Sequence, residues 1–386
     1  MRLAMTPTQI ATALLLGLGL TACVDDPDGT ATLDVPVDPA TGLRLADLPP
    51  VPPLPEWPDN PPTEAKKELG RALFSDVRLS GSGQTVCGNC HLPTSAFQSG
   101  GPLDAPDRSF PAITPTLHRH TPSMLNLVYA PMARWDGSHF TDLPDMMVLP
   151  FAEPNMNLSM LDVSAGEALD VPAAQVNLQH RLTVEIPGYV PLFEAAFGQD
   201  ITTLSPEQVW RLAGQAMAVY IRIAVSRDAA FDAWNAGDDD AISDAAKRGA
   251  LLFTGKARCT LCHSGPLTSD FEFHNVSTSV PDASGARPDE GRFLVTGRDE
   301  DRGKFLTPML RSAARTSPYL HDGSEASIAR VIAHFSGPDG RADPLNELAM
   351  IPALTDDEID DLVQFIKSLD GAPIPLEDLA PPTTLP

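Results

Sequence analysis

The chain has 386 residues, of which 42% are hydrophobic, and a formal net charge of −24 at pH 7. This length and hydrophobic content are sufficient for two globular domains of ordinary size. The negative charge excludes nucleic acid as a partner, because phosphate backbones require a basic surface. It is compatible with a basic protein partner such as a small cytochrome.

The N-terminal residues 1–22 have the features of a signal peptide. Arg2 supplies a positive charge, and the apolar run Ile10 to Leu20 is too short to span a bilayer as a stable helix. The ending Leu20-Thr21-Ala22-Cys23 resembles the lipobox of bacterial lipoproteins. We expect cleavage before Cys23 and acylation of its sulfur, with an ordinary cleaved signal as the alternative. Either way the mature chain is expected outside the cytoplasm, on the periplasmic side. In the lipoprotein alternative a lipid anchor alone would hold it to a membrane.

The rest of the chain divides by composition into four segments. Residues 23–60 and 372–386 are rich in proline and lack apolar periodicity, so we expect a tether and a loose tail. Between them lie two expected domains, residues 61–238 and 239–371. The boundary is placed at the acidic turn Gly237-Asp238-Asp239-Asp240.

Capping residues and apolar periodicity predict several helices. One begins near Thr63, and the strongest in the first half begins at Ser205, which forms a capping box with Gln208. A third covers about 243–253, and the last is capped by Thr355. Strand signals are weak throughout. The expected fold class is therefore mainly α, with long loops and little strand.

Two C-x-x-C-H motifs lie in the expected domains, one at residues 87–91 and one at 259–263. This spacing attaches a c-type haem, because two thiols three positions apart can reach both vinyl groups of one porphyrin edge. The histidine that follows supplies an axial nitrogen to the iron. We expect two covalently bound haem c groups, with thioether bonds at Cys87, Cys90, Cys259 and Cys262 and proximal iron ligands at His91 and His263.

A zinc site is the alternative for such a motif. Zinc ribbons need a second Cys or His pair within about 15–20 residues, whereas these two pairs lie far apart. The only other cysteine is Cys23. The segments around Gly70 and Gly249, which precede the two motifs, are alike and each contains a Leu-Phe pair. Two cytochrome c-like haem domains from an internal duplication are therefore expected.

Beyond the motifs, an ordered series of short segments resembles the bacterial di-haem cytochrome c peroxidase family, which includes the MauG-type enzymes. The resemblance covers roughly residues 60–369. It is carried by Leu69–Phe74, Arg78–Ser80, Thr121–Asn126, Arg134–Gly137, Ile186–Tyr189, Leu192-Phe193, Thr307–Arg311 and Ser317–Gly323.

The resemblance implies a peroxidase that works through both haems. Electrons from a small donor protein, a cytochrome c or a cupredoxin, enter at the C-terminal haem. They pass to the N-terminal haem, where hydrogen peroxide is reduced to water. Trp135 resembles the tryptophan between the haems, and His321 the histidine near the C-terminal haem. Ordinary core packing for Trp135 and a surface position for His321 are the alternatives.

The sequence departs from the family in the loop that carries the peroxidatic glutamate. In the family this glutamate carries the proton that lets the O–O bond of peroxide break, and it directly precedes a methionine. When the two sequences are aligned on Met156, the glutamate position is Asn155. An amide cannot take up and return a proton as a carboxylate does. Glu153, two positions away, is the candidate replacement. Either Glu153 takes this role or peroxidatic function is lost, and we favour the first.

Two further departures concern ligands. The family places Met or Tyr opposite the C-terminal haem histidine, where this chain has Phe335, and the neighbouring His334 would point about 100° away on a helix. Met309 is an alternative ligand or a packing residue. The family's interdomain calcium uses an asparagine whose position is His120, with carbonyl positions at Thr316 and Pro318. Because imidazole is a poor calcium ligand, calcium stays open as a cofactor. His118 and His120 could alternatively approach the N-terminal haem.

Three functions agree with these features. The first is an exported, lipid-anchored cytochrome c peroxidase-like oxidoreductase. The second is MauG-like oxidation of a residue on a partner protein, with Trp135 relaying electron holes. The third is a non-enzymatic di-haem electron carrier or redox sensor. The oligomeric state, including a homodimer, is left open.

Overall fold

The computed structural model describes residues 33, 35–98, 119–138, 142–154, 156–160, 169–338, 340, 342–348 and 351–386. It separates residues 1–34 from a unit that comprises residues 35–386, and everything below concerns the second unit. The predicted signal peptide, Cys23, His118 and Asn155 lie outside the described residues. None of the helices in the described part is both long and apolar enough to cross a membrane.

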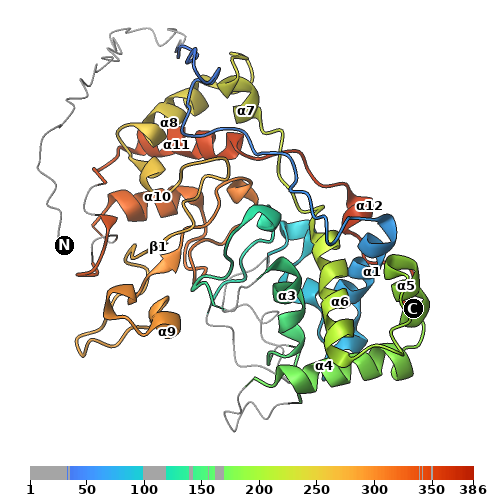
Figure 1. The fold of residues 1–386 in the computed structure, drawn as a ribbon. Helices are drawn as coiled ribbons and strands as arrows, with labels where there is room; N and C mark the ends of the chain where they lie inside the picture. The colour runs from blue at the N-terminus through green and yellow to red at the C-terminus, as the bar shows by residue number, and fades with distance from the viewer. Residues whose placement is uncertain are drawn as a thin grey trace, which may run out of the picture. The chain divides into compact units, whose positions relative to one another are not determined.

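The described fold is mainly helical, as predicted, with one short sheet (Figure 1). The first part contains α1 (Glu64–Ser75), α2 (Cys87–Cys90), α3 (Leu143–Val148), α4 (Val171–His180), α5 (Tyr189–Phe197) and α6 (Pro206–Ile221). The second contains α7 (Ala230–Asn235), α8 (Asp244–Thr254), α9 (Phe293–Thr296), α10 (Ile328–Ser336) and α11 (Asp356–Ser368), followed by α12 (Leu376–Leu379). Strands β1 (Phe273–His274) and β2 (Phe305–Leu306) pair antiparallel.

The predicted helix starts are confirmed. The Thr63 side chain accepts a hydrogen bond from the Lys66 backbone N–H at the start of α1. Capping boxes begin α6 at Ser205 and α11 at Thr355. Ser243 caps α8. These interactions span three residues each, so the sequence pattern is enough to specify them.

Each haem motif is preceded by a helix that crosses a second helix at a glycine. Helix α1 meets α6 at Gly70, where a Cβ atom would overlap the carbonyl oxygen of Ala216. Helix α8 meets α11 at Gly249, where a Cβ would overlap the carbonyl oxygen of Asp361. The absence of a side chain lets the two backbones approach in both places. This repeated construction supports the expected duplication.

Replacing Gly249 by alanine is expected to destabilise the fold by about 2 kcal/mol, because α8 and α11 must separate. This cost outweighs the gain of about 1 kcal/mol in helix propensity. Urea unfolding of the haem-loaded protein measures the change. Gly83→Ala is the control, since Gly83 has a positive φ but no atom lies near the place that a Cβ would take, and it should cost about 1 kcal/mol. Equal stability of the two variants would contradict a close crossing at Gly249.

The two hydrophobic cores meet just before helix α7. The N-terminal hydrophobic cluster includes α6 and reaches Ala224, whereas the C-terminal cluster begins, after Leu48, with Phe231 and Trp234 of α7. Phe231 packs edge-on against Phe365 of α11, with ring centroids 5.4 Å apart. Helix α7 therefore packs with the second core, and the division at residue 238 stays a prediction.

The predicted tether and tail are corrected where the structure describes them. Leu48 is fully buried in the C-terminal core, and the Arg222 guanidinium lies 4.4 Å from the ring centroid of Trp57. At the other end, Leu379 is buried in the N-terminal core and Arg78 donates a hydrogen bond to the carbonyl oxygen of Pro386. Residues 35–60 and 372–386 thus pack on the domains through the buried side chains of Leu48 and Leu379.

Candidate functional site

The two C-x-x-C-H motifs line one continuous cavity of about 830 Å³. The first motif forms α2 and the residue after it, and the second forms the 3₁₀ turn Cys259–Leu261 and the two residues that follow. Most of the other lining side chains are apolar, as in sites that bind large flat ligands.

The two motif histidines are oriented in the same way. The Nδ1 atom of His91 lies 2.9 Å from the carbonyl oxygen of Phe97, and that of His263 lies 2.9 Å from the carbonyl oxygen of Thr268. A hydrogen bond from Nδ1–H to a carbonyl fixes the ring and leaves Nε2 with its lone pair. Burial lowers the pKa of both imidazoles, which keeps them neutral. The Nε2 atom of each histidine is therefore free of this hydrogen bond and oriented as a candidate ligand for a haem iron.

The first cysteine of each motif is a buried thiol. Burial, and then the neighbouring Cys90, raise the pKa of the Cys87 thiol to about 12. Burial and Cys262 likewise raise the pKa of Cys259 to about 12. The donor set and the apolar walls therefore fit two covalently attached haems.

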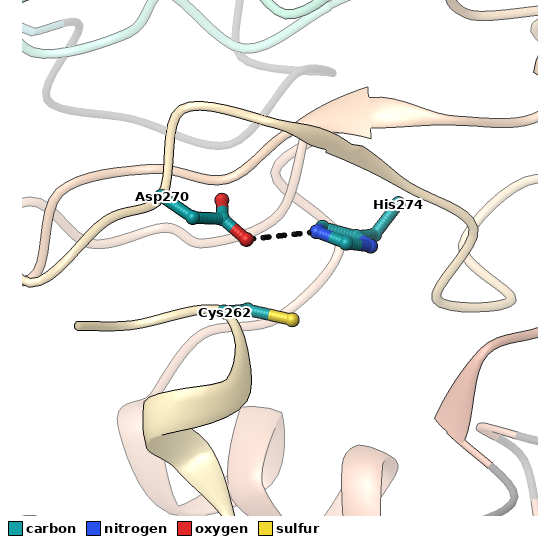
Figure 2. Close-up of side chains that lie close together, drawn as sticks. All are labelled: Cys262, Asp270 and His274. Atoms are coloured by element: carbon teal, nitrogen blue, oxygen red, sulfur yellow. Dashed lines mark hydrogen bonds and ion pairs between the residues drawn. The ribbon is translucent and has the colours of Figure 1, made fainter. Parts of the chain in front are cut away.

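Cys262, Asp270 and His274 form a compact cluster whose potential ligand atoms lie within 4.8 Å of one another (Figure 2). Both nitrogens of His274 are already engaged, Nε2 with Asp270 at 3.0 Å and Nδ1 with Glu347 at 2.6 Å. Hydrogen bonds to Cys262, Glu347 and Asp270 raise the pKa of His274 to about 11. Because both ring nitrogens already contact carboxylates, the cluster forms part of the surroundings of the second haem motif.

Glu153 lies in the cavity wall as one half of an ion pair. Its Oε1 atom is 2.7 Å from Nη2 of Arg134, which also lines the cavity and has a φ of 67°. The Glu153 carbonyl accepts hydrogen bonds from the N–H groups of Met156 and Asn157. Gly81 N–H donates in turn to the Met156 carbonyl. Sequence reasoning missed Arg134 as the partner, although it stands beside Trp135 in a family-like segment.

Trp135, His120 and His321 are brought together between the two motifs. Trp135 Nε1–H donates to the His120 carbonyl oxygen at 2.7 Å, and the His120 N–H donates to the His321 carbonyl oxygen at 2.6 Å. The His321 ring stacks on Phe305 with centroids 3.7 Å apart. All four residues line the cavity. The structure therefore places Trp135 and His321 in one connected group.

The remaining candidates for the second haem differ in position. Phe335 and Met309 both line the cavity. His334 is not among the described lining residues, and its Nε2 lies 2.8 Å from the carbonyl oxygen of Val276. His334 and Phe335, which are neighbours on α10, therefore point in different directions, as expected.

Comparison with known proteins adds the decisive observation. A sequence model described as di-haem cytochrome c peroxidase matches residues 64–240. The cytochrome-c peroxidase IdrP1 of Denitromonas iodatirespirans is 33% identical over 358 residues, which span 84% of this chain and 86% of that protein. This chain belongs to the di-haem cytochrome c peroxidase family. It is therefore an oxidoreductase, and its family implies two c-type haems.

Other members of the family extend the relationship to MauG. The methylamine utilization protein MauG of Methylophilus methylotrophus is 34% identical over 322 residues, 82% of this chain and 86% of that protein. A solved MauG-like protein associated with microbial copper homeostasis has 29% identity and a TM-score of 0.69. That match covers 88% of this chain and 99% of the solved chain.

Proposed function

We propose that this family member is an exported di-haem peroxidase that reduces hydrogen peroxide with electrons from a small cytochrome c or cupredoxin. The observation that carries the proposal is Glu153, whose carboxylate lies in the same cavity as the first haem motif. It offers the proton-carrying group that an amide at Asn155 lacks.

The first haem would be held by Cys87, Cys90 and His91, and the second by Cys259, Cys262 and His263. Bound haem supplies the iron at which peroxide is reduced and the redox centre that receives donor electrons. His91 and His263 would serve as the axial ligands, because their Nδ1 atoms are held by backbone carbonyls and their Nε2 atoms are left for the iron.

Reduction of hydrogen peroxide to two waters breaks the O–O bond and consumes two electrons and two protons. Glu153 can take a proton from one peroxide oxygen and deliver it to the oxygen that leaves as water. Arg134 orients the carboxylate through a charge-assisted hydrogen bond of 2.7 Å. Solvent supplies the second proton.

Electron transfer between the haem sites would use the group around Trp135. Its indole and the stacked rings of His321 and Phe305 line the cavity that both motifs share. A donor with a basic face would suit the net charge of −24. Phe335 offers no ligand atom, so the second iron would have Met309 or no side chain opposite His263. If no methionine sulfur binds the second iron, the reduction potential of that haem would be lower.

Export and anchoring rest on the N-terminal sequence. Residues 1–22 would be removed as a signal peptide, and Cys23 would carry the lipid. Covalent haem attachment at the two motifs agrees with export, because c-type haem is attached outside the cytoplasm.

MauG-like oxidation of a partner protein is the second candidate. It is favoured by the 34% identity to MauG and by Trp135 in the cavity wall, where an indole can carry an electron hole. Membership of an enzyme family disfavours the third function, a plain electron carrier.

Stopped-flow mixing of the half-reduced protein with hydrogen peroxide tests the proposal. We expect a rapid spectral change at one haem and steady turnover with a reduced cytochrome c. Spectral change without turnover, together with oxidation of a co-incubated partner protein, would instead favour the MauG-like function. No spectral change with peroxide would overturn both.

A further inference from the structure

Arg119 joins two carboxylates that come from different parts of the chain. Its Nη1 atom lies 2.7 Å from Oδ2 of Asp136, which follows Trp135. Its Nε and Nη2 atoms lie 2.6 and 2.9 Å from the two oxygens of Asp289, in the C-terminal half of the protein. The second contact is bidentate, which is the strongest geometry for an arginine–carboxylate pair.

The three side chains are shielded from solvent. The exposed fraction is 23% for Arg119 and 11% for each aspartate. Burial alone would raise the pKa of Asp136 and Asp289, but hydrogen bonds from Arg119 more than offset it, and both pKa values are lowered. Without a cation, two carboxylates in such surroundings would not both stay ionised.

This cluster adjoins the group between the haem sites. The Arg119 guanidinium lies 5.8 Å from the ring centroid of Phe305, which stacks on His321. Nε2 of His321 is 3.9 Å from Asp289. Arg119 therefore acts on Trp135 through its neighbour Asp136 and on His321 through Asp289.

His120 stands at the position of a calcium-ligating asparagine in the family, and its side chain is unsuited to calcium. Calcium takes oxygen ligands, whereas the asparagine position holds the imidazole of His120. The Cδ2 atom of this ring and the Cγ atom of Pro318 both lie 3.4 Å from where a Cβ on Gly323 would be, so both side chains pack near Gly323. An imidazole thus stands where the resemblance calls for an oxygen ligand.

We propose that the Arg119 guanidinium is the resident cation between the two haem domains, and that the protein needs no calcium. Arg119 is a positioning residue: it forms ion pairs with both Asp136 and Asp289 and holds the segments that carry Trp135 and His321. The proposal does not depend on peroxide turnover, because it concerns a charge that the folded chain supplies itself.

The test uses the haem-loaded protein and three variants, Arg119→Met, Arg119→Lys and Arg298→Met. Arg298 is a matched control, since its side chain is 65% exposed and pairs with a similarly exposed Glu300. Thermal unfolding is followed with EGTA and with millimolar calcium, and metal content is measured by mass spectrometry. The wild type is expected to contain no stoichiometric calcium and to unfold at the same temperature in both buffers.

Arg119→Met is expected to unfold several degrees lower in EGTA, while Arg298→Met stays at the wild-type value. Lysine at position 119 should restore part of the loss. Calcium should also raise the unfolding temperature of Arg119→Met, because the variant leaves both carboxylates without a cation. A purely steric role would not produce this gained calcium response.

Three results would overturn the proposal. The first is stoichiometric calcium in the wild type, with a fall in unfolding temperature when EGTA removes it. The second is an Arg119→Met variant that matches Arg298→Met in EGTA. The third is a destabilised Arg119→Met variant that neither lysine nor calcium restores. The measurement on the wild type decides even if a variant fails to fold.

Discussion

Replacing Cys87 and Cys90 together by serine is expected to leave the protein with one covalently bound haem instead of two. The two thiols are the only cysteines in the described N-terminal part of the cavity wall, so no other side chain there can form the thioether bonds. Mass spectrometry of the denatured chain should show the loss of one haem mass. Haem-stained gels should show about half of the wild-type signal per chain.

The matched pair, Cys259 and Cys262 to serine, should lose the other haem and keep the first. The two variants are therefore distinguishable by their remaining absorption spectra, although each carries one haem. Two covalent haems in either double variant, or stoichiometric zinc in the wild type, would show that the motifs do not act as proposed.

Replacing Glu153 by glutamine is expected to slow peroxide reduction about 10²- to 10⁴-fold, the range for loss of a proton-transferring side chain. Glutamine retains the size of the side chain but cannot carry a proton. It also removes the charge that pairs with Arg134. Stopped-flow rates with the half-reduced protein measure the effect, and haem content should be unchanged.

Two further variants separate the loss of the proton-carrying group from the loss of the ion pair with Arg134. Glu185→Gln is the matched control, because Glu185 is half exposed and pairs only with His180 and Arg181 near the surface of the described part of the chain. It should react at the wild-type rate. Arg134→Met keeps the Glu153 carboxylate but removes its partner, and should give an intermediate rate. A Glu153→Gln variant as fast as Glu185→Gln would exclude Glu153 as the proton carrier.

The ion pair at Glu153 illustrates where sequence reasoning reached its limit. The alignment on Met156 identified Asn155 as a departure and Glu153 as a candidate two positions away. The alignment could not identify Arg134 as the partner of Glu153, because these two residues are 19 positions apart and meet only when the loops fold. Its neighbour Trp135 was singled out only because a family segment carries it.

The N-terminal segment 35–60 also shows what sequence composition cannot predict. Proline-rich composition correctly indicated a lack of regular structure in residues 35–60, where the described chain has no helix or strand. It wrongly indicated a free tether, because burial of a few residues such as Leu48 depends on pockets that distant segments form. The packing of α7 with the second core was likewise out of reach, since Phe231 meets Phe365 only in the folded core.

Features that depend on neighbours a few positions apart could be determined from the amino-acid sequence. The caps at Thr63, Ser205 and Thr355, the spacing of both C-x-x-C-H motifs and the mainly helical fold class all belong here. The folded chain was needed to show which residues share the cavity, that Arg119 joins Asp136 to Asp289, and that Arg134 pairs with Glu153. Ion pairs between distant residues leave no periodic trace in a sequence, because their geometry exists only after the chain has packed.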